Sequence, residues 1–490
     1  MERQPLQPVR ITQTAARWAV LLSVVTGVRA ADVEWWTGTI EVPGQPLDFV
    51  VKWTPAGAGD YRATIDISAQ GARGLALIDI TFTAEVVRFV LPPVGTAPPS
   101  AKAEFDLRRS ADGASAAGDF RQHGLTFPVR MRRVTESEAQ AVGPPRPQTP
   151  KPPFPYTVRQ VEYENPVDTT KLAGELTVPE GTGPHPAVLL VTGSGAQDRD
   201  ETIFGHKPFL VIADHLTRRG IAVLRVDDRG VGSSSGSLAK VTGKDLANDV
   251  LAGVQFLERQ PEIDPARVGL IGHSEGGLIA LLVASRSKDV ACVVLLAAPG
   301  RTGSEILLAQ NAALLRASGV AEDEIRRHLE AHRAAHERVL ADADEETLRA
   351  AVRELVRLQL ALGSGGGPPT DEQLEAGIAL GLRQFRSPLL RWFLRHDPRE
   401  TLAKVRCPVL ALAGGLDLQV DPKENLPEIE AALKRAGNPQ VAVKELPGLN
   451  HLFQEARTGL VQEYLTIEQT MSPAALDEIA AWLRARYGLK

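Results

Sequence analysis

The residue of this chain best suited to covalent chemistry is a serine set between glycines at the junction of two apolar runs. Residues 272–276 read Gly-His-Ser-Glu-Gly, with Ser274 at the centre. A short apolar run precedes them at 268–271, and an apolar run typical of a helix follows at 277–285. This order predicts a strand, a sharp turn and a helix, which would expose the serine Oγ. The glycines suit a strained turn that has no room for a Cβ.

A second segment, residues 232–236, fits the same Gly-x-Ser-x-Gly pattern. It follows the polar residues 227–230, and no apolar helix begins directly behind it. We therefore interpret residues 232–236 as a flexible loop without catalytic chemistry.

A serine nucleophile needs a base, and on this kind of turn the acid and then the histidine follow the serine along the chain. Of ten histidines, His451 alone lies beyond residue 400, in a turn-rich stretch after the strand-like residues 440–445. Asp417 ends the predicted strand at 408–413, and Asp421 on the same loop is the alternative acid. The predicted triad is therefore Ser274, Asp417 and His451.

The expected roles follow from the chemistry of the three side chains. His451 would take the proton of the Ser274 hydroxyl during attack and return it to the leaving group. Asp417 would hold one tautomer of the imidazole and stabilise the imidazolium.

A tetrahedral intermediate also needs two amide donors, which form an oxyanion hole. The amide of Glu275 directly follows the nucleophile. We assign the second amide to Ser194, with Gly195 as the alternative, on the loop after the predicted strand at 186–192.

Several segments together resemble one group of bacterial α/β-hydrolases, the serine aminopeptidase-like and carboxylesterase group. They are residues 192–201, 228–232, 272–277, 397–398, 407–417 and 448–451, in this order. The resemblance implies an α/β-hydrolase fold and carboxylic ester hydrolysis, and it leaves the substrate open. One departure is Thr192, where a His-Gly dipeptide is common, so the usual histidine that braces the oxyanion loop is missing.

The elements that must position these residues begin near residue 157, where strand and helix patterns alternate. Such alternation predicts an α/β fold with a mostly parallel sheet and helices on both faces. We assign residues 157–300 and 397–490 to the two parts of this core. Residues 301–396, rich in Ala, Leu, Arg and Glu at helical spacing, are predicted to form a helical cap over the active site.

The preceding residues form three further predicted segments. Residues 1–31 carry arginines before a short apolar stretch and then small residues, which is typical of a secretory signal peptide. Residues 32–134 show alternating apolar positions and predict a separate β-rich domain that resembles a small lipocalin-like domain. Residues 135–156 are a Pro-rich linker. We therefore expect an exported protein, periplasmic or extracellular.

The composition of the chain argues against some classes of binding partner. The net charge is −5 and there is no long basic run, which argues against nucleic acid and anionic membrane surfaces. We expect a small-molecule ester as substrate, no cofactor and no metal, and the sequence leaves a homo-oligomer open. His328, His332 and His336 share one helix face in the cap, but the serine mechanism needs no zinc.

Two further points stay open. Cys292 and Cys407 are expected as buried thiols, with a disulfide as the alternative in an exported protein. The rival functions are a peptidase, for which the cap residues Glu322, Asp323 and Glu324 would hold a substrate amine, and a secreted binding protein without catalysis.

Overall fold

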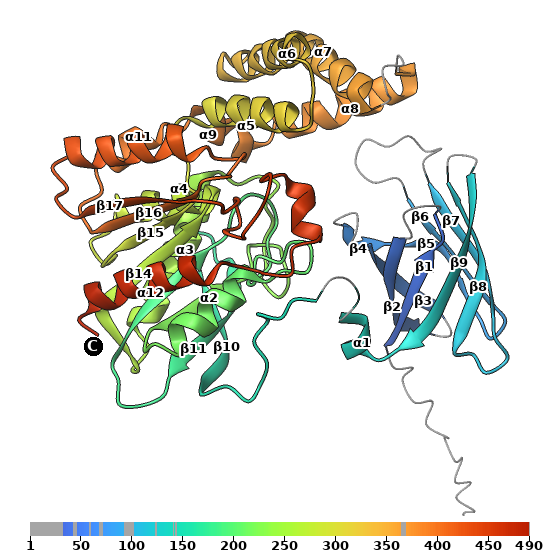
Figure 1. Cartoon of the computed structure of the whole chain (residues 1–490), viewed down its shortest axis with the longest axis horizontal. Coiled ribbons are helices and arrows are strands. Elements are labelled where there is room, and N and C mark those ends of the chain that lie inside the picture. Colours follow the sequence, from blue (N-terminus) through green and yellow to red (C-terminus); the bar gives the residue numbers. More distant parts are fainter. Residues whose placement is uncertain are drawn as a thin grey trace, which may run out of the picture.

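The computed structural model describes residues 33–42, 47–57, 60–67, 72–92, 102–122, 125–140, 142, 145–363 and 369–489. The predicted signal peptide lies outside the described residues. Figure 1 shows two parts joined by the linker: a β-rich domain, and an α/β body with helices stacked above it. The expected α/β body with a mostly parallel sheet and the separate N-terminal β-rich domain are confirmed.

The N-terminal domain is one antiparallel sheet in the order β4-β3-β2-β1-β9-β8-β7-β6-β5. It curls so that β3 and β5 come into contact. Its interior is packed with aromatic side chains, among them Trp36, which belongs to the core, whereas Lys52 lies over the ring of Trp35. The strands are β1 (Glu34–Ile40), β2 (Leu47–Gly57), β3 (Asp60–Ile67), β4 (Ala72–Ala76), β5 (Ile78–Phe82), β6 (Val86–Leu91), β7 (Ala103–Arg109), β8 (Ser115–Gln122) and β9 (Leu125–Val134).

The linker begins with a short helix, α1 (Glu136–Gln140), and then runs along the α/β body. Gln148 Nε2 donates to the carbonyl of Met471 at 2.7 Å, and Gln148 Oε1 accepts from the amides of Thr470 at 2.6 Å and Met471 at 3.0 Å. Arg146 donates to the carbonyls of Ile467 at 2.7 Å and Phe204 at 2.8 Å. Over these residues the linker is therefore part of the body's surface.

The α/β body contains a sheet in the order β10-β11-β13-β12-β14-β15-β16-β17. The pairs from β13 to β17 are parallel, and β10 and β11 add antiparallel pairs at one edge. The strands are β10 (Tyr156–Glu164), β11 (Lys171–Pro179), β12 (His185–Val191), β13 (Ala222–Val226), β14 (Ile263–His273), β15 (Val293–Leu296), β16 (Val409–Gly414) and β17 (Val441–Leu446).

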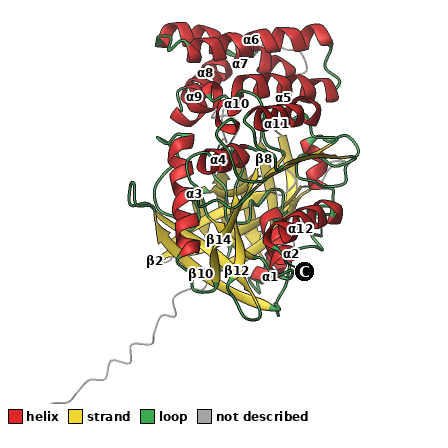
Figure 2. Cartoon of the chain, turned by 90° about the vertical axis from the view of Figure 1, so that its left-hand side faces the viewer, coloured by secondary structure: helices red, strands yellow, loops and turns green. Residues whose placement is uncertain are grey.

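Helices cover both faces of this sheet because its central strands are apolar on both sides (Figure 2). One core lies under α3 (Gly243–Glu258), α4 (Glu275–Ala284) and α11 (Pro422–Arg435), and the other lies under α2 (Pro208–Thr217) and α12 (Pro473–Tyr487). The two cysteines are free thiols, and Cys292 Sγ lies 3.4 Å from the hydroxyl of Tyr487.

Five helices that lie between β15 and β16 in the sequence form a layer above the body (Figure 2). Their apolar faces form a core of their own, so the layer is more than a loop. It rests on the body through α9, where the Trp392 ring fills the space beside Gly243 at the start of α3. The helices are α5 (Gly303–Ala317), α6 (Glu322–Leu340), α7 (Glu345–Gly363), α8 (Asp371–Phe385) and α9 (Pro388–Arg395), followed by the short α10 (Pro398–Leu402).

Candidate active site

Ser274 stands on a sharp turn between β14 and α4. Its φ of 53° and ψ of −122° are strained for a residue with a Cβ. The turn is held by its amide, which donates to the carbonyl of Leu296 at 2.8 Å. A Cβ at Gly276 would collide with the carbonyl oxygens of Val191 and Thr192, and one at Gly272 with the carbonyl of Gly276. The glycines of this pattern are therefore required by close packing of the backbone.

His451 and Asp417 meet at the carboxyl end of the sheet. His451 Nδ1 lies 2.8 Å from Asp417 Oδ2, and both side chains are buried. The other oxygen, Oδ1, accepts from the amides of Gln419 at 2.8 Å and Val420 at 2.9 Å, which fixes the carboxylate. Asp421, the alternative acid, instead caps α11 by accepting from the amide of Lys423 at 2.8 Å.

The turn that carries Ser274 and the loop that carries His451 are adjacent. The centre of the His273 ring, next to Ser274, lies 4.8 Å from that of the His451 ring. In the described part of the chain no hydrogen bond joins the Ser274 hydroxyl to His451. Catalytic hydrogen bonds of this kind often form only when substrate is bound.

The loop after β12 carries the amides expected from the sequence to act as oxyanion donors. The amide of Gly193 is already used, since it donates to Glu201 Oε1 at 2.6 Å. The amides of Ser194, Gly195 and Glu275 have no acceptor among the described residues. Donors left unpaired beside the nucleophile are what an oxyanion hole requires.

Glu201 and His273 were present in the quoted motifs but were given no role from the sequence. Glu201 Oε1 also contacts His273 Nδ1 at 2.9 Å, and His273 Nε2 contacts the carbonyl of His451 at 3.1 Å. Thr192 donates to Asp228 at 2.7 Å. The oxyanion loop is thus braced by Glu201 and Asp228, although the histidine common at position 192 is absent.

Comparison with known proteins places the chain in a family of hydrolases. Residues 188–463 match the model of the alpha/beta hydrolase family. Esterase EstD of Thermotoga maritima is 30% identical over 323 residues, which are 65% of this chain and 67% of EstD. This chain belongs to the alpha/beta hydrolase family.

Other similarities are more distant. The thiohydrolase aneE of Aspergillus aculeatus is 33% identical over 139 residues, which cover 28% of this chain and 41% of aneE. The structure of the alpha/beta hydrolase GrgF from Penicillium matches 68% of this chain and all of that one, at 17% identity and a TM-score of 0.42.

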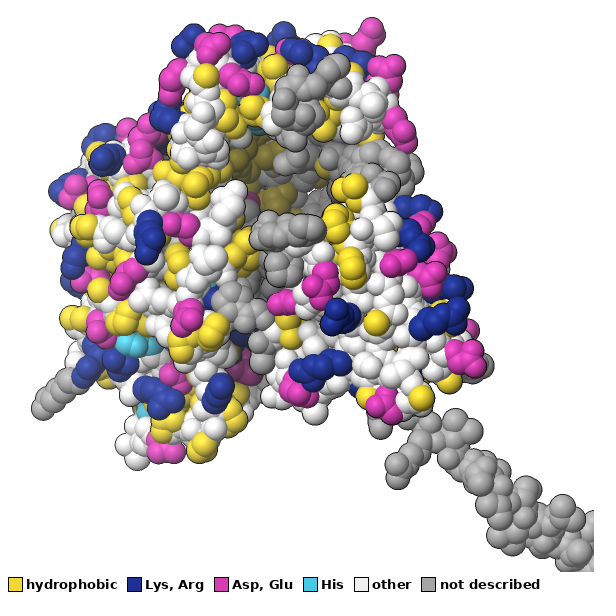
Figure 3. All heavy atoms as spheres, turned by 45° about the vertical axis from the view of Figure 1, so that its right-hand side comes forward, with side chains coloured by type: hydrophobic (Ala, Val, Ile, Leu, Met, Phe, Trp, Pro, Cys, Tyr) yellow, Lys and Arg dark blue, Asp and Glu magenta, His cyan; other side chains and the backbone are white. Residues whose placement is uncertain are grey.

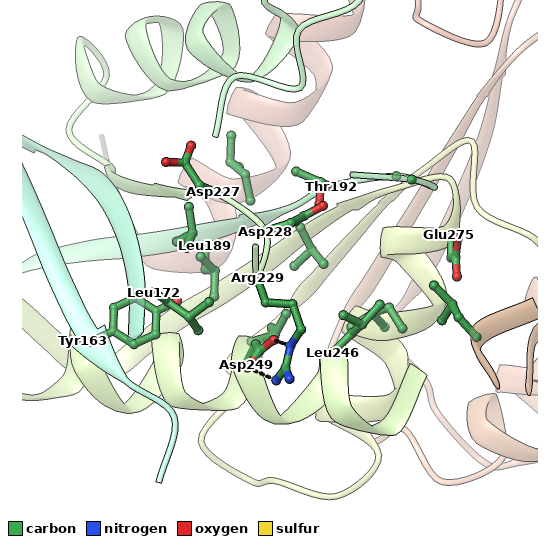
Figure 4. Close-up of a pocket in the computed structure, with 18 residues that line it drawn as sticks. Tyr163, Leu172, Leu189, Thr192, Asp227, Asp228, Arg229, Leu246, Asp249 and Glu275 are labelled. Atoms are coloured by element: carbon green, nitrogen blue, oxygen red, sulfur yellow. Dashed lines mark hydrogen bonds and ion pairs between the residues drawn. The ribbon is translucent and has the colours of Figure 1, made fainter. Parts of the chain in front are cut away.

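A pocket of this hydrolase extends from the oxyanion loop between the sheet and α3. Figure 4 shows Glu275 at one end and Tyr163 and Leu172 at the other. Leu389 of the cap also lines it. Figure 3 shows that the molecule is hollowed below the cap helices, with hydrophobic side chains gathered on the wall of this recess. The cap therefore contributes to the walls around the site.

The carboxyl groups of the pocket differ in their partners. Asp249 is paired with Arg229, and Asp227 with Arg199. Burial raises the pKa of Asp228 to about 7, although Thr192 and the amide of Gln197 donate to it. Burial also raises the pKa of Glu275, whose Oε1 has no hydrogen-bond partner.

The second Gly-x-Ser-x-Gly segment, residues 232–236, is a loop, as predicted. It is well anchored, contrary to the expected flexibility, because the Ser234 hydroxyl donates to the carbonyl of Asp227 at 2.7 Å and accepts from the amide of Ala173 at 2.9 Å. Ser234 is therefore occupied and cannot act as a nucleophile there.

The three histidines of the cap lie on α6 without forming a metal site in the described residues. His336 Nδ1 contacts the Ser304 hydroxyl at 3.0 Å, and His328 Nδ1 contacts the carbonyl of Glu324 at 3.1 Å. They serve contacts within the cap.

Of the acidic cap residues considered for a peptidase, Glu322 and Asp323 are exposed in ion pairs, and Glu324 is half-buried. Glu322 pairs with Arg316 at 2.6 Å and Asp323 with Arg327 at 3.7 Å, and these four side chains are exposed. They are charges on a helix surface.

Proposed function

We propose that this chain is a serine esterase that cleaves carboxylic esters of small molecules through an acyl-enzyme at Ser274. The observation that carries the proposal is the buried His451–Asp417 hydrogen bond of 2.8 Å beside a serine held at a φ of 53°. The similarity to EstD, which is named an esterase, supports the same class of reaction.

The proposed reaction has two half-reactions. His451 takes the proton of the Ser274 hydroxyl as its Oγ attacks the ester carbonyl, and the amides of Ser194 and Glu275 bind the resulting oxyanion. The carbon–oxygen bond to the alcohol then breaks, and His451 returns the proton to the leaving alkoxide. In the second half, His451 deprotonates a water that attacks the acyl carbonyl, the bond from that carbon to Ser274 Oγ breaks, and His451 returns the proton to Oγ as the acid leaves. Asp417 keeps the Nδ1 proton of His451 in place throughout.

Hydrolysis of p-nitrophenyl butyrate by the purified protein and by Ser274→Ala tests the proposal. We expect clear turnover by the intact protein and a loss of about 10⁶ in kcat for the variant, as in other serine hydrolases that lose the nucleophile. Equal turnover by both proteins would show that Ser274 is not the nucleophile. Binding of an ester without turnover by either protein would favour the non-catalytic role.

A peptidase is the second candidate within the same chemistry, and its distinguishing need is a site for a free amine. Two of the cap residues first considered for this need, Glu322 and Asp323, are exposed on α6 and paired with arginines. Comparison of aminoacyl esters and amides with a free and with an acetylated amine would separate the two. A peptidase of this kind should cleave the amides and need the free amine, whereas we expect only the esters to be cleaved, at a rate that does not depend on the amine.

We also propose that the protein is exported, on the basis of the positive residues and apolar stretch in residues 1–31. In the part of the chain that the structure describes, no helix has both the length and the apolar character to cross a membrane. Fractionation of expressing cells, with N-terminal sequencing of the product, tests export. An uncleaved product in the cytoplasm would contradict it.

A further inference from the structure

A chain of three hydrogen bonds links the two loops that the proposed reaction uses. It runs from the amide of Gly193 to Glu201 Oε1 at 2.6 Å, from His273 Nδ1 to the same oxygen at 2.9 Å, and from His273 Nε2 to the carbonyl of His451 at 3.1 Å. Gly193 precedes the expected oxyanion donor Ser194. The chain therefore joins the oxyanion loop directly to the backbone of the catalytic base.

The partners of His273 define its protons. A carbonyl oxygen only accepts, so Nε2 carries a proton toward His451. Glu201 Oε1 accepts from the Gly193 amide, and a carboxylate is acceptor-only, so Nδ1 donates as well. An imidazole that donates from both nitrogens is the charged imidazolium. Burial alone would lower the pKa of His273, but the Glu201 carboxylate and both hydrogen bonds raise it overall.

The charges around Glu201 and His273 are also consistent with an imidazolium at His273. Glu201 accepts from the amide of Gly193, one residue before the expected donor Ser194, and an uncompensated carboxylate there would repel the negative charge that develops on the substrate. The imidazolium of His273 neutralises it. Asp417 and His451 are the other titratable groups that face His273.

The backbone of Glu201 has a φ of 52°, which is uncommon for a residue other than glycine. Its side chain and that of His273 are both buried. A strained, buried residue of this kind is retained where the surrounding contacts hold it in place.

We propose that Glu201 and His273 are positioning residues, a carboxylate–imidazolium pair that holds the oxyanion loop and the His451 loop at the spacing catalysis needs. The proposal rests on the proposed esterase function. The pair touches neither the substrate nor the reacting atoms, and it acts through the Gly193 amide and the His451 backbone. It also provides the brace that the missing histidine at position 192 would have supplied.

Glu201→Gln is the sharpest test, because the amide oxygen can still accept from both donors while the charge is lost. We expect kcat for p-nitrophenyl butyrate to fall about tenfold to a hundredfold with little change in KM, somewhat less than the loss of an oxyanion donor itself. At high pH, where His273 loses its proton, kcat should fall. In the variant this fall should occur at a lower pH, because the His273 pKa loses the support of the carboxylate. An unchanged kcat and pH profile would overturn the proposal.

A double variant separates positioning from simple loss of structure. His273→Asn can still donate toward Glu201, but it leaves the carboxylate uncompensated near the oxyanion loop. Adding Glu201→Gln to this variant removes that charge, so we expect the double variant to be more active than His273→Asn alone. If the two losses multiply instead, the residues act independently and the proposal is wrong. Thermal unfolding of each variant checks that it is folded.

One readout does not depend on activity. The nitrogen chemical shifts of isotope-labelled histidine, assigned to His273 by comparison with His273→Asn, report whether both ring nitrogens are protonated. We expect the imidazolium pattern to persist at about pH 8, above the ordinary histidine pKa of about 6.5. A neutral ring at that pH would overturn the pair. If the pattern is present but no ester is cleaved, the esterase function has failed and the pair has not.

Discussion

At the scale of single residues, the two acids of the loop after β16 give a matched pair for testing the triad. Asp417→Asn keeps the shape of the side chain but favours the wrong tautomer of His451, so we expect kcat to fall by about 10⁴, as for the equivalent change in other triads. Asp421→Asn should leave kcat within about twofold, because asparagine is also a good helix cap. Steady-state kinetics on p-nitrophenyl butyrate checks both variants. Equal losses in the two would remove Asp417 from its assigned role.

Glu275 provides a prediction about stability and pH. Burial raises the pKa of its side chain, so the folded protein holds a proton that the unfolded chain releases above about pH 4.3. Stability is therefore lost as pH rises from that value through the folded pKa. Glu275→Gln does not titrate and keeps the backbone amide, so its stability relative to the intact protein should increase as pH rises above about 4.3.

Denaturant unfolding of both proteins at several pH values measures this difference. A constant difference across the range would mean that the Glu275 side chain has an ordinary pKa. The substitution also tests whether the side chain, as distinct from the amide, affects ester turnover.

The residues that sequence reasoning reached are those whose order along the chain carries meaning. Ser274, Asp417 and His451 each follow a recognisable strand, so their meeting at one edge of the sheet could be predicted. Glu201 and His273 could not be paired in this way, because their contact joins residues 72 positions apart and depends on how the loop after β12 turns. No local pattern of a sequence records such a turn.

At the scale of elements, the histidines of α6 make the cap sensitive to acid. Burial, and then a neighbouring histidine, lower the pKa of both His332 and His336 to about 4. The unfolded residues take up protons below about pH 6.5, so the stability they contribute at neutral pH is lost as pH falls from about 6.5 to 4. We expect the protection of amides in α5 and α6 against hydrogen exchange, corrected for the intrinsic exchange rate at each pH, to fall over this range.

His336→Asn is the corresponding control, since asparagine can keep the contact of Nδ1 with Ser304 but cannot titrate. The variant should lose less protection on acidification than the intact protein. Identical loss in both would assign the acid sensitivity to other groups.

The apolar patterns of the sequence predicted most of the helices and strands, but they predicted the first and last residues of these elements less well. β14 begins at Ile263, five residues before the apolar run at 268, and its register with β12 shifts between His185 and Ala187. Residues 264–267 of this strand, Asp-Pro-Ala-Arg, hide its start, since they include a proline and show no apolar alternation. The short α10 was likewise unmarked, because five residues are too few for a helical period.

At the scale of the whole molecule, the linker belongs to the hydrolase body. Gln148→Ala would leave the amides of Thr470 and Met471 and one carbonyl without their partner, so we expect a loss of about 1–3 kcal/mol in unfolding free energy. Faster hydrogen exchange should be confined to the stretch around residues 464–471. Gln148→Glu keeps an acceptor for both amides and should cost less. Equal stability of all three proteins would mean that the linker contributes nothing to the body.

The composition of the linker predicted a spacer, and its hydrogen bonds to the body could not be anticipated. Gln148 contacts residues more than 300 positions later in the chain, and a Pro-rich sequence gives no sign of such a partner. The division of the chain into two sheets, in contrast, followed from the change of apolar period near residue 157.

The helical cap leaves the body and returns to it at nearly one point. Glu305, in the first turn of α5, accepts from Arg301, just before this first cap helix, at 3.3 Å and from Arg399 in α10, after the last one, at 3.4 Å. β15 and β16, which the cap separates in sequence, are neighbours in the sheet. In evolutionary terms the cap is therefore a self-contained insertion that could be gained, lengthened or exchanged without rerouting a strand. Descendants of such a chain can change what they bind while they inherit the same α/β body.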